Sequence, residues 1–137
     1  MNQAQTYISD DDFLAQFANQ TLDPVYFDHK GHIRLAYLYL KRYDLESAIS
    51  EISHGIQAYA SSLGAKDKFH ITITDAITRI ISSRLRTSNG QGFQSFIDAN
   101  SDLLNDGIAV LCQYYSYDLL MSDDAKVRLV APDLKSI

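Results

Sequence analysis

Three of the four histidines in the sequence stand where a helix is expected to begin. His29 and His32 are three residues apart, and both fall on the apolar face of a predicted helix, the face that Ala36 also marks. His70 stands at the start of another predicted helix, beside an apolar stripe. The fourth, His54, falls opposite the apolar stripe of its helix, so we expect it at the surface. The first three histidines are therefore candidates for a site inside the molecule.

The position of these imidazoles predicts their charge. A helix N-terminus carries partial positive charge, which opposes protonation of a nearby imidazole, and burial acts in the same direction. We therefore expect the three side chains to be neutral at pH 7, the state that a metal ligand or a general base requires. Asp28, next to His29, can orient an imidazole by accepting its N–H.

Three interpretations of these histidines stay open at this point. His29, His32 and His70 could ligate a divalent metal such as zinc or iron and leave one coordination position free. They could instead line a metal-free pocket in which one imidazole acts as a base on a small molecule. In the third interpretation they are core residues whose ring nitrogens are satisfied by tyrosine hydroxyls and backbone carbonyls.

Residues near these histidines are candidates for the same site. Tyr115 lies in a segment with several hydroxyl groups and joins the three histidines as a candidate catalytic residue, although packing near a helix end also explains that segment. Lys68 could bind an anionic group together with the N–H groups of a helix N-terminus. The candidates for binding the substrate are Lys68, Thr72, Thr74 and Ser116.

Capping residues and hydrophobic periodicity predict the helices that would position these side chains. Ser9, Asp28 and Asp44 are good N-caps, and Gly64 is a natural stop after the strongest apolar period in the chain. Shorter helices are expected after a turn at 89–92, one of them starting at Ser101 or Asp106, and Pro132 ends the last of them. The sequence predicts one all-α domain over residues 1–137, a compact helical bundle of about five to six helices.

The segment after Phe69 could be read in two ways. Its β-branched residues alternate with others as in a strand. However, Ile73, Ile77, Ile80 and Ile81 share one face only in a helix, and no second strand is available for pairing. We therefore predict a helix from about residue 70 to Arg86.

Composition excludes several classes of partner. The net charge is −5 and the twelve basic residues are scattered, which argues against nucleic-acid binding. The apolar stretches are shorter than the roughly 20 residues that cross a bilayer, so no membrane association is expected. The first residues have neither a basic nor an apolar region of a signal peptide, and we expect a cytoplasmic protein.

Four motifs resemble those of a bacterial family of small helical proteins whose function is unassigned. The family shows Phe-x-His-x-x-His and Lys-Tyr-His-x-Thr-x-Thr, matched here by residues 27–32 and 68–74, with Tyr-Tyr-Ser at 114–116 and Pro-Asp-Leu at 132–134. The similarity covers about residues 10–134. The chain departs from the family at Phe69, where tyrosine is favoured, and at Ile71, where an acidic residue is common. The resemblance implies that His29, His32 and His70 belong together, but it implies no reaction.

Two functions compete on this basis. The first is a small protein that binds or acts on a small-molecule ligand through a three-histidine pocket, with or without a metal. The second is a non-catalytic interaction or regulatory module whose histidines are structural. The substrate, the reaction and the oligomeric state stay open.

Overall fold

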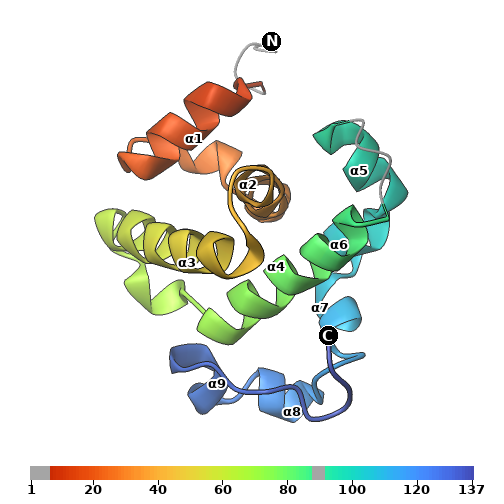
Figure 1. Ribbon diagram of the computed structural model, residues 1–137. Helices are drawn as coiled ribbons and strands as arrows, with labels where there is room; N and C mark the ends of the chain where they lie inside the picture. The colour runs from red at the N-terminus through yellow and green to blue at the C-terminus, as the bar shows by residue number, and fades with distance from the viewer. Residues whose placement is uncertain (1–6, 88–91) are drawn as a thin grey trace.

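The computed structural model describes residues 7–87 and 92–137 (Figure 1). Within these ranges the chain forms nine α-helices and two short 3-10 helices, without a β-strand. The predicted all-α bundle is therefore confirmed, with more helices than the five to six expected. The predicted turn at 89–92 lies almost entirely outside the described ranges. No helix in the described ranges is both long enough and apolar enough to cross a bilayer.

The first three helices begin at the predicted caps. A side-chain oxygen of Ser9, Asp28 or Asp44 accepts a hydrogen bond from the backbone N–H three residues further along the chain. These caps satisfy N–H groups that the helix itself leaves without partners. The helices are α1 (Asp10–Ala18), α2 (His29–Leu40) and α3 (Leu45–Ser62). A short 3-10 helix, η2 (Pro24–Tyr26), leads into α2.

The segment after Phe69 is helical, as predicted from its isoleucine stripe. It follows the 3-10 helix η3 (Lys66–Lys68) and forms α4 (Ile71–Leu85). Ile80 and Ile81 are buried, and α4 packs against both α2 and α3. Burial of one face thus outweighs the β-propensity of the individual residues.

The second half of the chain forms five short helices where fewer were expected. The backbone leaves helical geometry at Asn100 and again at Asp106, with φ of −129° and −137°. Caps at Ser116 and Ser122 start the last two helices. The five are α5 (Phe93–Ala99), α6 (Ser101–Asn105), α7 (Gly107–Leu111), α8 (Tyr117–Leu120) and α9 (Asp123–Val127).

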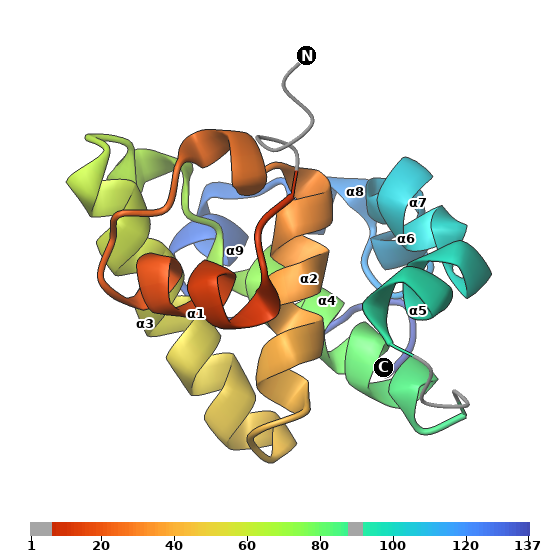
Figure 2. The ribbon, with the colours of Figure 1, turned by 90° about the horizontal axis from the view of Figure 1, so that it is seen from above.

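Helix α2 lies at the centre of the arrangement. It packs against α3 and α4, which also pack against each other. Two views show α1 and α3 on one side of α2 and the α5–α7 segment on the other side (Figures 1 and 2). Helix α9 packs on α4. Side chains such as Phe13, Leu35, Ile81 and Leu103 are fully buried and connect these elements into one hydrophobic core.

Candidate functional site: a cavity beside helix α2

A cavity of about 750 Å³ lies between α2, α3, α4 and the α6–α7 segment. Most residues in its wall are apolar. They come from all the surrounding helices and include Ile33, Ile52, Ile56, Ile73, Ile77 and Leu111. Polar side chains are contributed mainly by the first turn of α2 and by the junction of α6 with α7. The arrangement is that of a small-molecule pocket, which has an apolar wall and a few polar groups that orient the ligand.

His32 is the histidine of this wall whose ring has no hydrogen-bond partner among the described residues. Its imidazole stacks on the ring of Phe27, with centroids 4.0 Å apart. Neither ring nitrogen of His32 has a hydrogen-bond partner among the described residues. His32 is exposed to solvent where it borders the cavity, although protein atoms surround much of its ring. Both nitrogens are therefore available to a molecule in the cavity.

The surroundings of His32 keep its imidazole neutral. Burial by the surrounding protein lowers the pKa of His32 to about 4, and the nearby charge of His29 acts in the same direction. Asp28 opposes this shift but does not outweigh it. At pH 7 one ring nitrogen of His32 is therefore a hydrogen-bond acceptor and the other is a donor. This lowered pKa agrees with the predicted neutral imidazole, and the ring can accept a hydrogen bond.

His29 lines the same cavity but has a structural partner. Its Nε2 lies 2.8 Å from the carbonyl oxygen of Leu103 in α6. Because a carbonyl only accepts, Nε2 carries the proton and donates. Gly107 lies against the ring, and a Cβ atom at that position would be 3.1 Å from Nε2. His29 thus connects α2 to the α6–α7 segment that closes one side of the cavity.

Two carboxylates border the cavity as well. Asp28 caps α2 through Oδ1, which accepts from the N–H of Gly31 at 2.9 Å. Asp106 precedes Gly107 and makes no side-chain capping bond. The cavity wall contains no lysine or arginine among the described residues. Its polar groups are therefore acidic or neutral.

His70 lies outside this cavity, and the prediction that three histidines converge is wrong. Its Nδ1 accepts the N–H of Ile73 at 3.0 Å and caps α4, while Nε2 lies 2.9 Å from the carbonyl oxygen of Leu120 and donates to it. Both nitrogens are thus satisfied by the backbone, as in the structural interpretation. Burial lowers the pKa of His70 more than its two hydrogen bonds raise it, so this imidazole is neutral too.

The metal site predicted at His29, His32 and His70 is therefore not formed. The described residues contain no group of three or more histidine, cysteine, aspartate or glutamate side chains that could hold a metal ion. The physical reason is the capping role of His70, since a nitrogen that accepts a backbone N–H has no lone pair left for zinc or iron. His54 is exposed, as predicted.

Of the other predicted site residues, only Thr74 borders the cavity. Thr72 is fully buried, where its hydroxyl donates to the carbonyl of Arg128 at 3.0 Å and accepts the N–H of Val130 at 3.3 Å. Tyr115 is also buried and donates to the carbonyl of Val130 at 2.9 Å. Thr72 and Tyr115 thus hold the segment that follows α9 and do not meet the cavity.

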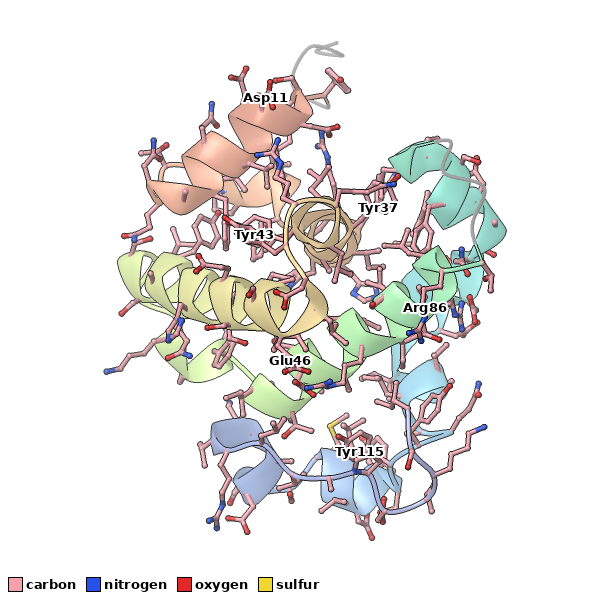
Figure 3. All side chains as sticks on the ribbon, in the orientation of Figure 1. Asp11, Tyr37, Tyr43, Glu46, Arg86 and Tyr115 are labelled. Carbon is pink, nitrogen blue, oxygen red and sulfur yellow. The ribbon has the colours of Figure 1, made fainter. Side chains whose placement is uncertain are left out.

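The remaining two predicted residues lie elsewhere. Ser116 caps α8 and its N–H donates to the carboxylate of Asp133 at 2.7 Å. Lys68 is exposed in η3 and is absent from the cavity wall. Figure 3 shows Tyr115 beside α8, well away from α2. The Tyr-Tyr-Ser segment therefore serves packing and has no contact with the cavity.

Sequence reasoning missed the opposite wall of the cavity, formed by Asn105, Asp106 and Gly107. Asp-Gly is a turn signal, and it marks the break between α6 and α7. Phe27 belongs to the Phe-x-His-x-x-His motif, but the sequence gives no sign of its role. Its stacking on His32 depends on the 3-10 turn before α2, which periodicity does not reveal.

Comparison of the chain with protein-family models, with curated proteins and with solved structures found no match. The resemblance to a bacterial family stays a prediction, and the function is inferred from the cavity.

Proposed function

We propose that this protein binds a small, largely apolar molecule in the cavity beside α2, and that His32 contacts the polar group of that molecule. The observation that carries this proposal is the unpartnered imidazole of His32 at the edge of an apolar cavity of about 750 Å³. Cavities of about 300–1,000 Å³ are typical of small-molecule sites. The volume is therefore that of a ligand site and far exceeds the voids of ordinary packing.

The separation of apolar and polar groups in the cavity wall supports this assignment. Isoleucine and leucine side chains from four elements would exclude water from the body of the ligand, and removal of apolar surface from water supplies most of the binding free energy. The polar groups near His32 would fix the orientation. Because the ring is neutral, it can accept a hydrogen bond from an O–H or N–H group of the ligand.

His29 and Phe27 support His32 without competing for the ligand. Phe27 fixes the plane of the His32 ring by stacking on it. His29 donates a hydrogen bond from Nε2 to the carbonyl oxygen of Leu103 and so holds the α6–α7 wall against α2. The proposed site is therefore preorganised on one side by a long helix and on the other by a tethered segment, which lowers the entropic cost of binding.

Binding of an uncharged apolar dye would test the proposal. Nile red fluorescence should rise on binding in a saturable, single-site manner, and phenylbutanol should displace the dye. Ile77→Phe fills the cavity from α4, and we expect it to weaken dye binding severalfold. Val127→Trp is the control, because Val127 is exposed on α9 and does not line the cavity.

The result depends on the variants being folded, which circular dichroism and urea unfolding would establish. A second variant, Ile108→Trp, fills the cavity from α7, on another side of the cavity, and does not disturb α4. Equal dye binding by the wild type, Ile77→Phe and Ile108→Trp would contradict the proposal. Binding that is lost in both and retained in Val127→Trp would support it.

A further inference from the structure

The carboxylates around the cavity indicate which polar group the ligand carries. Asp28 immediately precedes His29 and is close enough to His32 to influence its charge. Asp106 immediately precedes Gly107, which lies against the His29 ring. The two carboxylates therefore lie at the same end of the cavity, around the two imidazoles.

Among the residues that the structure describes, these carboxylates have no basic partner. Within residues 7–87 and 92–137, neither Asp28 nor Asp106 forms an ion pair with a lysine or arginine. Two arginines of the surrounding helices α2 and α4 have other partners: Arg34 pairs with Asp10 at 2.7 Å, and Arg84 pairs with Asp102 at 2.6 Å. The polar end of the cavity thus has a negative potential, in a protein whose net charge is −5.

The hydrogen-bonding groups at this end are mainly acceptors. Each carboxylate is acceptor-only when ionised, and the neutral His32 ring adds one acceptor nitrogen. The N-terminus of α2 alone would favour an anion, but the Asp28 carboxylate occupies that position as the cap. A carboxylate or phosphate on the ligand would therefore meet like charge and few donors.

We propose that the ligand of this cavity is an apolar amine, bound as its ammonium ion. The apolar body would occupy the isoleucine-lined part of the cavity. The ammonium group, which has three donors and one positive charge, would be shared between His32, Asp28 and Asp106. This inference rests on the proposed function, because it assigns the polar group of a ligand that the same cavity binds.

Three probes with the same skeleton and different polar groups would test the assignment by isothermal titration calorimetry. Phenylbutylamine is a cation at pH 7, phenylbutanol is neutral and phenylbutanoate is an anion. The expected order of affinity is amine, then alcohol, then carboxylate. Added salt should weaken binding of the amine and leave that of the alcohol nearly unchanged, because ions screen charge.

The double variant Asp28→Asn/Asp106→Asn removes both charges and keeps the shape of the site. Asparagine caps a helix about as well as aspartate, and Asp106 makes no capping bond, so the fold should persist. Binding of phenylbutylamine should weaken by about tenfold, which corresponds to a modest charge interaction at each carboxylate. Binding of phenylbutanol should weaken far less, because asparagine keeps a hydrogen-bond acceptor at each position.

Asp67→Asn/Asp118→Asn is the matched control, since both residues are exposed, lie outside the cavity wall and change the net charge equally. It should bind phenylbutylamine like the wild type. Carboxylate binding as tight as amine binding, or amine binding that survives in Asp28→Asn/Asp106→Asn, would overturn the amine assignment. If phenylbutanol still binds in that case, the proposed function stands. Failure of all three probes to bind would overturn both.

Discussion

The imidazole of His29 lies 2.8 Å from the carbonyl oxygen of Leu103 and connects the first turn of α2 to α6. The two residues are far apart in the sequence, and this bond brings the two walls of the cavity together. Arg84 adds a second connection, since its guanidinium pairs with Asp102 in α6 and also donates to the side-chain oxygen of Asn100 at 3.1 Å. The short α6–α7 segment is therefore held in place by side chains of α2 and α4.

Replacement of His29 by alanine should loosen this segment. Loss of the bond to Leu103 should lower the free energy of unfolding by about 1 kcal/mol. Amide exchange in residues 101–111 should accelerate more than exchange in α3, because only the tethered segment loses a partner. Hydrogen exchange followed by mass spectrometry would measure both effects.

His54→Ala is the control for that substitution. His54 is exposed, and its contact with the Ser50 hydroxyl is long, at 3.5 Å. The free energy of unfolding of the His54→Ala protein should stay within about 0.5 kcal/mol of the wild-type value. Unchanged exchange in residues 101–111 of the His29→Ala protein would show that His29 does not hold the segment.

His70 should prove to be a structural residue. In His70→Ala, α4 loses its cap and the bond to Leu120 is lost, which together should cost about 2 kcal/mol of stability. His70→Asn restores an acceptor for the N–H of Ile73 but not the bond to Leu120, so it should recover about half of that loss. Urea unfolding would compare the three proteins, with dye binding as a second readout.

A catalytic or ligand-binding role would give a different pattern. If His70 contacted the ligand, His70→Asn would abolish dye binding whatever its stability. We expect the folded His70→Asn protein to bind the dye like the wild type, since His70 lies outside the cavity wall.

Local rules predicted the first half of the fold well. A cap such as Ser9 or Asp44 is followed by an apolar period, and both signals lie within a few residues of each other. The same logic identified α4, because its isoleucines fit only one helical face. A helix was expected to start at either Ser101 or Asp106, but the backbone breaks at both places. The second break was not predicted, because contacts with His29 and Arg84, distant in the sequence, hold the segment around it.

The candidate site was half predictable for the same reason. His29 and His32 share a helix, so their spacing fixes their proximity, and both line the cavity. The position of His70 relative to them depends on how α4 crosses α2 and on which ring nitrogens the backbone uses. Neither feature can be predicted from the hydrophobic periodicity of a single segment. The resemblance to a family grouped the three histidines. In the fold, however, His70 bonds to the backbone through both ring nitrogens, whereas His32 borders the cavity without a partner.

Gly31 should tolerate no side chain. It lies in the first turn of α2, where a Cβ atom would be 2.1 Å from the backbone carbonyl oxygen of Tyr26. Alanine normally stabilises a helix interior relative to glycine by about 1 kcal/mol. Here the clash with fixed backbone should reverse the sign, and Gly31→Ala should destabilise the protein by about 1–3 kcal/mol.

The adjacent variant Lys30→Ala controls for a change in the same turn, because Lys30 is exposed. It should unfold within about 0.5 kcal/mol of the wild type. Thermal and urea unfolding of both variants would measure the difference. A Gly31→Ala protein that is as stable as the wild type would contradict the close packing of η2 on α2.

The neutral state of His32 predicts a specific pH dependence of stability. Its pKa is lowered to about 4 in the folded protein, whereas an unperturbed imidazole titrates at 6.5. Between these values the unfolded chain binds a proton at this residue and the folded chain does not, so protonation favours unfolding. The contribution of the neutral His32 imidazole to the stability of the fold is complete above pH 6.5, and it is lost as the pH falls toward 4. Solvent in the open cavity reaches the ring and reduces the size of the effect.

His32→Leu isolates this contribution, because leucine does not titrate. At pH 7.5 the variant should be about as stable as the wild type, since removal of a polar group together with its need for a partner is nearly neutral. At pH 5 the variant should be more stable than the wild type, and His70, whose pKa is also lowered, acts equally in both proteins. Urea unfolding at several pH values would give the difference. A difference that does not change between pH 7.5 and pH 5 would show that the pKa of His32 is not depressed by the fold. If the difference does grow as the pH falls, His32 is a neutral acceptor at the edge of the cavity, as the binding proposal requires.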